Sequence, residues 1–224
     1  MDILVVLEDN RGSLHRMSKE AIAGAQKMGG SISALAIGPN GDALAEELSG
    51  VDLVEVITVS HDLVSSYNAD GYSEVVKQVI ESESPQTIVI GHSYQTRDFM
   101  PRVSAKLDIP FIPDIISMDD GIVKQVLNAK LNALVTTSAD QVILSFQSAT
   151  FSEEAMVTGS CLTRSIEVNL DSSIVRSEAE DPFQEDAGDV DLESAELIVS
   201  IGRGIEKEEN ISMAFDLAKV LGAE

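Results

Sequence analysis

The fold is decided by residues 87–107, which read TIVIGHSYQTRDFMPRVSAKL. The run Thr87–Gly91 is short, rich in β-branched residues and closed by a glycine, as is typical of a buried strand. The residues from Asp98 to Leu107 have a helical pattern, and Pro101 is tolerated there because it would lie in the first turn of the helix. A strand that leads into a helix is one half of a β-α-β unit, so this stretch predicts a sheet covered by helices.

The same alternation of strand and helix extends back to the N-terminus. Apolar, β-branched runs predict further strands at Ile3–Leu7, Ser31–Ile37 and Leu53–Val59. Apolar residues at helical spacing predict helices at Leu14–Met28, Ala43–Leu48 and Tyr72–Glu81. Strands that alternate with helices require crossover connections, which produce a mainly parallel sheet with both faces covered. The predicted fold class is therefore α/β, a mainly parallel sheet flanked by helices, and it resembles the Rossmann-like and adenine-nucleotide alpha-hydrolase-like folds.

The alternation of predicted strands and helices ends after Pro110. Strand-like runs with short polar gaps follow one another without an intervening helix, at Phe111–Met118, Gly121–Leu127, Ala133–Thr137 and Gln141–Phe146. Short connections favour antiparallel pairing, so these runs predict an antiparallel part that extends the sheet or packs against its edge. Thr163–Asn169 and Ser173–Ser177 are two further strand candidates.

An acidic stretch, residues 178–193, predicts a domain boundary. It contains Pro182 and Gly188 and has no sustained period, which is typical of an exposed linker. It would separate an N-terminal α/β domain, 1–177, from residues 194–224. The latter predict one strand, Ala195–Ser200, and one helix from about Glu208 to a stop at Gly222. A single strand and helix cannot bury a core alone, so we expect 194–224 to be the incomplete start of a further domain.

Composition excludes several classes of protein. The formal net charge of −23 argues against nucleic-acid binding, which needs Lys and Arg to displace the counterions of phosphates. No apolar run approaches the roughly 20 residues that span a bilayer, so we expect no membrane insertion. Cys161 is the only cysteine, which excludes an internal disulfide and favours an intracellular protein.

The strongest candidate site is the turn Gly202-Arg203-Gly204 between the predicted strand and helix near the C-terminus. Glycines at such a turn let backbone amides approach a phosphate, and an arginine adds a fixed fork of donors. Two glycines fall short of a dinucleotide fingerprint, so in isolation a tight turn with a surface arginine is the simpler interpretation.

A second candidate site follows the strand Thr87–Gly91. His92, Ser93 and Arg97 would lie at its carboxyl end, where open parallel sheets place ligand crevices, and they offer groups for an anion. The alternative is a polar loop in which Thr96 or Asp98 caps the next helix. The histidines are scattered along the chain and Cys161 stands alone, so no spacing indicates a metal site or a catalytic constellation.

Several stretches together resemble the alpha subunit of electron-transfer flavoproteins, over the length of the chain and in the family's order. These are Met1–Glu8, a helix ending at Gly29-Gly30, Asp98–Leu107 with Asp114–Ile116, Asn132-Ala133, Val142–Leu144, Phe151, Ala195–Gly204 and Glu209-Asn210.

The resemblance implies an electron carrier rather than an enzyme. In the family, the alpha subunit has an N-terminal α/β domain and a C-terminal FAD domain, and it forms a heterodimer with a beta subunit. The pair accepts electrons from flavin dehydrogenases, often the acyl-CoA dehydrogenases of fatty acid β-oxidation, and passes them to a quinone oxidoreductase or another acceptor. It implies that Arg203 contacts FAD, with Gly202 and Gly204 as turn-formers. The compartment implied is the cytoplasm, or the mitochondrial matrix in a eukaryote.

The sequence departs from the family pattern at Ile201, Leu131 and Gln147, where glycine or arginine is common. The resemblance stops before the family's later segments, which hold most FAD contacts. We therefore expect the chain alone not to retain FAD, and to show no flavin absorbance near about 450 nm.

Two other hypotheses remain open. One is a stand-alone adenine-nucleotide-binding module, although Asp9–Ser13 is a poor substitute for the glycine-rich phosphate loop that it needs. The other is a self-associating structural domain that pairs through its terminal helix.

Overall fold

The computed structural model describes residues 1–177 and 195–224. The chain divides into two compact units, 1–179 and 180–224. The predicted acidic linker, 178–193, lies outside the described residues, and the predicted domain limits stay a prediction.

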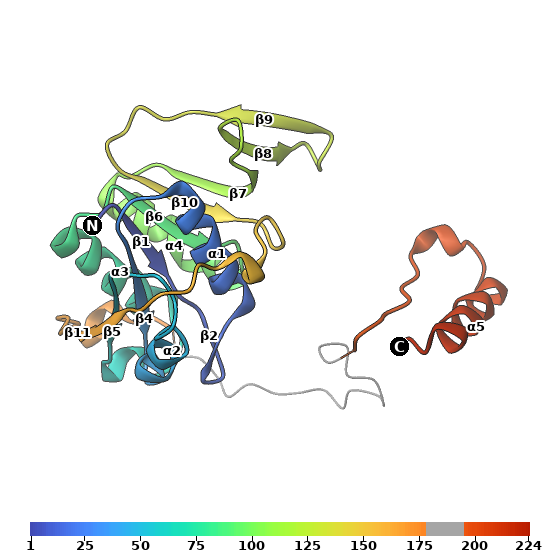
Figure 1. The fold of residues 1–224 in the computed structure, drawn as a ribbon, viewed down its shortest axis with the longest axis horizontal. Coiled ribbons are helices and arrows are strands. Elements are labelled where there is room, and N and C mark those ends of the chain that lie inside the picture. Colours follow the sequence, from blue (N-terminus) through green and yellow to red (C-terminus); the bar gives the residue numbers. More distant parts are fainter. Residues whose placement is uncertain (178–194) are drawn as a thin grey trace. The chain divides into compact units, whose positions relative to one another are not determined.

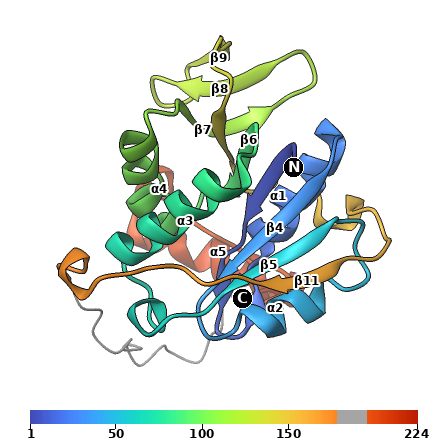
Figure 2. The ribbon, with the colours of Figure 1, turned by 90° about the vertical axis from the view of Figure 1, so that its left-hand side faces the viewer.

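The first unit is built on one nine-stranded sheet, in the order β11-β5-β4-β1-β6-β10-β7-β8-β9 (Figures 1 and 2). Neighbours are parallel from β11 to β7, and β8 and β9 add an antiparallel extension at one edge. The predicted α/β class is therefore confirmed. The strands are β1 (Ile3–Val6), β4 (Ile32–Ile37), β5 (Glu55–Val59), β6 (Thr87–Gly91), β7 (Phe111–Ser117), β8 (Ile122–Val126), β9 (Leu131–Val135), β10 (Val142–Phe146) and β11 (Leu162–Ser165).

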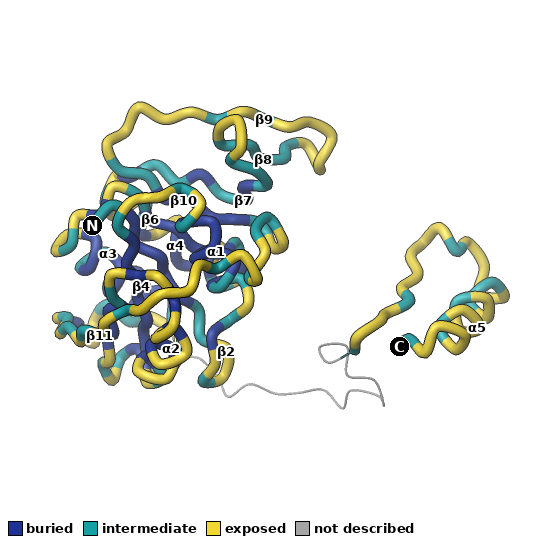
Figure 3. Tube along the Cα trace, in the orientation of Figure 1, coloured by how far each residue is buried: buried dark blue, intermediate teal, exposed yellow. Residues whose placement is uncertain are grey.

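Helices cover both faces of this sheet. Ile3 and Val5 of β1 pack on one face, which α1 (Arg16–Met28) and α2 (Gly41–Glu47) cover. Leu4 and Val6 point to the opposite face, which α3 (Ala69–Glu83) and α4 (Tyr94–Leu107) cover. Every residue of β1 and β4 is buried, whereas β9 is largely exposed (Figure 3). A strand covered on both faces has no polar side, which explains the unbroken apolar runs in the sequence.

Helix α4 begins at Tyr94, earlier than the predicted Asp98, and the cap is neither Thr96 nor Asp98. The Ser93 hydroxyl caps the helix by accepting a hydrogen bond from the Thr96 amide at 3.1 Å. The Thr96 hydroxyl in turn donates to the Gly91 carbonyl at 2.6 Å. Pro101 therefore lies inside the helix and not in its first turn. It is exposed, so water can satisfy the carbonyl that its missing N–H leaves free.

Strand β10 corrects the prediction that all runs after Pro110 pair antiparallel. It lies between β6 and β7 and is parallel to both, whereas β8 is antiparallel to both of its neighbours, β7 and β9, as predicted. The reason is its composition, because Ile143, Leu144, Ser145 and Phe146 are all buried. A continuously apolar strand gains most from a central position with helices on both faces.

The remaining elements of the first unit are short. The hairpin β2 (Asp9–Asn10) and β3 (Ser13–Leu14) follows β1, so α1 begins at Arg16 rather than at Leu14. Of the two late strand candidates, Thr163–Asn169 is a strand only as far as Ser165, within β11, which pairs with β5 at the edge opposite the extension. Ser173–Ser177 is not a strand, because Asp171 caps a 3₁₀ turn at Ser172–Ile174. Two other 3₁₀ turns are η1 (Asp62–Val64) and η2 (Glu153–Ala155).

The described part of the second unit contains α5 (Ile211–Leu221), and its predicted stop at Gly222 is confirmed by a left-handed cap. The predicted strand Ala195–Ser200 does not form. This segment makes only two backbone hydrogen bonds to the chain end, from the Val199 amide to Glu224 and from the Glu224 amide to Leu197. A strand needs a neighbouring strand to complete its hydrogen bonds, and residues 195–224 supply none.

No helix of the described residues is long and apolar enough to cross a membrane.

We expect Ser33→Ala to raise the free energy of unfolding by about 1 kcal/mol. The Ser33 hydroxyl is buried in β4 and has no hydrogen-bond partner among the described residues, so its desolvation is uncompensated. Chemical denaturation would measure the change. Ser31→Ala is the matched control, because the Ser31 hydroxyl exchanges hydrogen bonds with Asp2 and its loss should destabilise the protein. An equal loss of stability in both variants would contradict the prediction.

Candidate functional site

The strand order creates a topological switch point beside β1. The chain passes from β1 to β4 on one side and later returns to β6 on the other. Loops that leave the carboxyl ends of two such strands diverge, and the space between them is where open α/β sheets bind ligands. A cavity of about 350 Å³ lies there, lined by Glu8, His15, Met17, His92, Ser93, Tyr94, Arg97, Asp114, Gln147 and Ser148.

This cavity brings together the three residues of the second predicted site. His92, Ser93 and Arg97 all line it. Ser93 is committed to capping α4, so it is a positioning group, whereas Arg97 is exposed. The Arg97 guanidinium carbon lies 5.2 Å from the centre of the Tyr94 ring, which gives the side chain a cation-π contact.

His92 is held by a buried serine of β10. Its Nδ1 lies 2.8 Å from the Ser145 Oγ, and the Asp114 amide donates to the same oxygen at 3.3 Å. The Ser145 hydroxyl can also donate its own hydrogen to Nδ1 of His92. In a neutral His92 that accepts this hydrogen bond, Nε2 carries the hydrogen.

The electrostatics agree with a neutral His92. Burial lowers the pKa of His92 below its ordinary value, and the positive charges of Arg97 and Lys124 act in the same direction. The negative charge of Asp114 opposes them. The histidine therefore offers an N–H donor, and not a positive charge, at neutral pH.

Sequence reasoning missed Ser145, Asp114 and Glu8 as members of this site. Asp114 has a φ of 61° and sits at an irregularity of β7, a backbone conformation that few residues other than glycine adopt. One signal was available for Ser145, since it is the polar residue within the apolar run Val142–Phe146. The hydrogen-bond partner of that serine depends on which strands lie beside β10. The sequence predicted antiparallel pairing for this strand, whereas it is parallel to β6 and β7.

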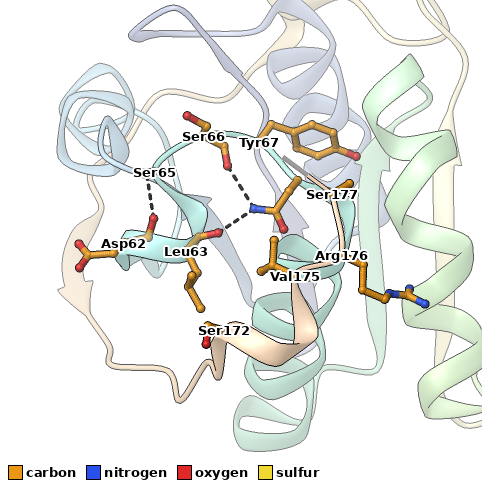
Figure 4. A pocket seen from close by; sticks show the side chains of 10 residues that line it. Asp62, Leu63, Ser65, Ser66, Tyr67, Ser172, Val175, Arg176 and Ser177 are labelled. Atoms are coloured by element: carbon orange, nitrogen blue, oxygen red, sulfur yellow. Dashed lines mark hydrogen bonds between the residues drawn. The ribbon is translucent and has the colours of Figure 1, made fainter. Parts of the chain in front are cut away.

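A second cavity, of about 550 Å³, lies between η1 and residues 172–177 (Figure 4). Asn68 lines this cavity, and its side-chain amide donates to the carbonyls of Leu63 and Ser66. Next to it, Asp70 accepts hydrogen bonds from Arg176 at 2.7 Å and from Arg102 at 2.9 Å. The bound Arg176 guanidinium lowers the pKa of Asp70, against the effect of burial. This contact fixes the end of the first unit on α3.

The hairpin Asp9–Leu14 occupies the place where a nucleotide-binding module would carry its phosphate loop. The Gly12 amide donates to the Asp9 carboxylate at 2.7 Å, and Asn40 donates to the same carboxylate group. A loop whose amide already binds an acidic side chain leaves little room for a phosphate there.

The first predicted site, Gly202-Arg203-Gly204, lies in the second unit. Its structure differs from the predicted strand-turn-helix, because Arg203–Ile205 form a single 3₁₀ turn and α5 begins only at Ile211. All three residues are exposed, and a Cβ added to either glycine would meet no atom within 4 Å. The first amides of such a turn have no intrahelical acceptor. The turn therefore fits an approaching phosphate with its amides and the Arg203 guanidinium, although it encloses no ligand by itself.

The described residues favour neither metal binding nor a reactive thiol. Residues 1–177 and 195–224 contain no group of three or more His, Cys, Asp or Glu side chains placed to hold a metal ion. Cys161 is partly buried, and its thiol donates to the Leu48 carbonyl at 3.1 Å. Burial raises the pKa of this thiol, which disfavours the reactive thiolate.

Fold and site together define a Rossmann-like α/β protein with a ligand crevice at the carboxyl ends of its strands. Residues 3–169 match the electron transfer flavoprotein domain, and residues 191–224 match the electron transfer flavoprotein FAD-binding domain. The chain belongs to the electron transfer flavoprotein family, which groups it with electron carriers rather than with enzymes.

Similar proteins carry matching names. The chain is 29% identical to the electron transfer flavoprotein subunit alpha of Bacillus subtilis, over 99% of this chain and 70% of that protein. It is 25% identical to the protein FixB of Clostridium saccharobutylicum, over 98% of this chain and 69% of that protein. A probable mitochondrial electron transfer flavoprotein subunit alpha of Caenorhabditis elegans is 29% identical to this chain, over 98% of this chain and 67% of that protein. These matches support an alpha-subunit role.

Proposed function

We propose that this chain acts as an electron transfer flavoprotein alpha subunit that carries electrons on FAD, in a heterodimer with a beta subunit. It would accept electrons from flavin dehydrogenases, such as acyl-CoA dehydrogenases, and pass them to a quinone oxidoreductase or another acceptor. The observation that carries the proposal is the FAD-binding domain match over 191–224, because it contains the Gly202-Arg203-Gly204 turn. The site of action would be the cytoplasm, or the mitochondrial matrix in a eukaryote.

The residues of the turn have separate roles in this proposal. Arg203 would pair with the FAD pyrophosphate through its guanidinium, which forms no ion pair with the described residues. Gly202 and Gly204 would let the backbone approach, since the space above both is open. When bound, FAD supplies the redox chemistry, and the protein contributes binding and orientation.

We expect Arg203→Ala to weaken FAD binding by about tenfold or more, because it removes a charged partner of the pyrophosphate. The measurement is flavin content and FAD affinity of the alpha–beta complex, prepared with the full natural alpha chain. Lys207→Ala is the matched control, since Lys207 is also exposed and positively charged but is paired with Glu209 at 3.3 Å.

Two outcomes would count against different parts of the proposal. Unchanged FAD affinity in Arg203→Ala would exclude the proposed contact while leaving the carrier role in place. A complex of the natural chains that binds no FAD would exclude the flavin role itself.

A further inference from the structure

The cavity at the carboxyl ends of β1, β6 and β10 holds charged side chains of both signs that lack ionic partners. Arg97, Glu8 and Asp114 line it, and none of them forms an ion pair with the residues of 1–177 or 195–224. Other cations of this acidic chain are paired, as Arg102, Arg164 and Arg176 are, whereas Arg97 is not. Unpaired charges that converge on a cavity favour a ligand of matching chemistry.

We propose that this cavity binds a sugar phosphate, with the phosphate between Arg97 and Nε2 of His92 and the sugar hydroxyls on Glu8 and Asp114. The site lies in the first unit, whereas the turn around Arg203 belongs to the second unit.

Two side chains would donate hydrogen bonds to the phosphate. Nδ1 of His92 lies 2.8 Å from the Ser145 Oγ, and when Nδ1 accepts the hydroxyl hydrogen, the Nε2–H can be donated to a phosphate oxygen. Arg97 adds a permanent charge and a planar fork of N–H groups, the geometry that suits phosphate oxygens. Tyr94 lies beside the guanidinium and limits its freedom, so less entropy is lost when a ligand binds.

The carboxylates that line the cavity favour a ligand that carries hydroxyl groups. Glu8 and Asp114 are partly buried carboxylates whose side chains accept no hydrogen bond from the described residues. They would repel a bare phosphate, but they are good acceptors for sugar hydroxyls, as acidic residues in other α/β folds are for ribose. A phosphate linked to a polyol satisfies both ends at once.

The size of the cavity limits the ligand. About 350 Å³ lies near the lower end of the range for small-molecule sites, roughly 300–1,000 Å³. This volume fits a pentose phosphate or the ribose phosphate part of a mononucleotide, and not a dinucleotide.

Calorimetric titration of the purified protein with ribose 5-phosphate, AMP, inorganic phosphate and ribose would test the proposal. We expect saturable binding of ribose 5-phosphate, and binding of inorganic phosphate or ribose weaker by about tenfold or more, because each engages only one end of the site. The ratio of AMP to ribose 5-phosphate affinity tells whether a base adds contacts.

Variants connect the binding to this cavity. Arg97→Ala should weaken ribose 5-phosphate binding by about tenfold or more, since a charge-assisted contact is lost. Arg97 is exposed, so its removal should leave the fold intact, which thermal unfolding would check. Lys130→Ala is the control, because Lys130 is an exposed cation between β8 and β9 and does not line the cavity. His92→Ala should also weaken binding.

Three results would overturn the proposal. The first is the absence of saturable binding by both ribose 5-phosphate and AMP. The second is equally tight binding of inorganic phosphate, which would indicate an unspecific anion site. The third is an equal effect of Arg97→Ala and Lys130→Ala, which would place the binding elsewhere.

Discussion

Gly91→Ala should be among the most damaging single substitutions in the first unit, with an expected loss of about 3 kcal/mol in the free energy of unfolding. A Cβ at Gly91 would lie 2.6 Å from the Cβ of Met17 and 3.0 Å from its carbonyl oxygen. The second contact is with backbone, which cannot rotate away as a flexible side chain can. Relief would require β6 and α1 to move apart at the switch point, next to His92.

Chemical denaturation would measure this loss, and Gly50→Ala supplies the control. Gly50 is exposed, and an added Cβ there would meet no atom within 4 Å. That variant should be nearly neutral or slightly more stable, since alanine restricts the unfolded chain. If the two variants were equally stable, α1 could not pack against β6 as closely as the structure has it.

Phe146→Ala should cost about 3–5 kcal/mol, because it deletes a large, fully buried side chain from a central strand. The Phe146 ring packs edge-on against Phe151, with centroids 4.7 Å apart. Gly24 of α1 has no side chain at this point, and a Cβ there would lie 2.6 Å from the Phe146 ring. The space is shaped for the ring, so its removal leaves a cavity that the helix cannot readily fill.

The matched control is Phe215→Ala on α5, the same deletion at a side chain that is 73% exposed. It should change stability by no more than about 0.5 kcal/mol. A loss below about 1 kcal/mol for Phe146→Ala would instead fit a half-exposed strand at the edge of the sheet. The experiment therefore separates the central position of β10 from the antiparallel edge position that the sequence suggested.

The residues of the candidate sites could be predicted from the sequence only in part. His92, Ser93 and Arg97 were predictable as a group because they follow one strand and must lie at its carboxyl end. Ser145 and Asp114 come from other strands, and they reach His92 only because β10 lies between β6 and β7. The turn around Arg203 was predictable as a turn, but its 3₁₀ form and its distance along the chain from α5 were not.

Local pattern alone determined the α/β class, the order of most strands and helices, and the stop of α5 at Gly222. These features depend on periodicity and on the conformational preferences of neighbouring residues, which are local properties. Tertiary structure alone decided that β10 is central and parallel and that 195–200 forms no strand. The physical reason is that strand neighbours are chosen by the burial of whole faces and by hydrogen bonds between residues distant in sequence, which no local pattern records.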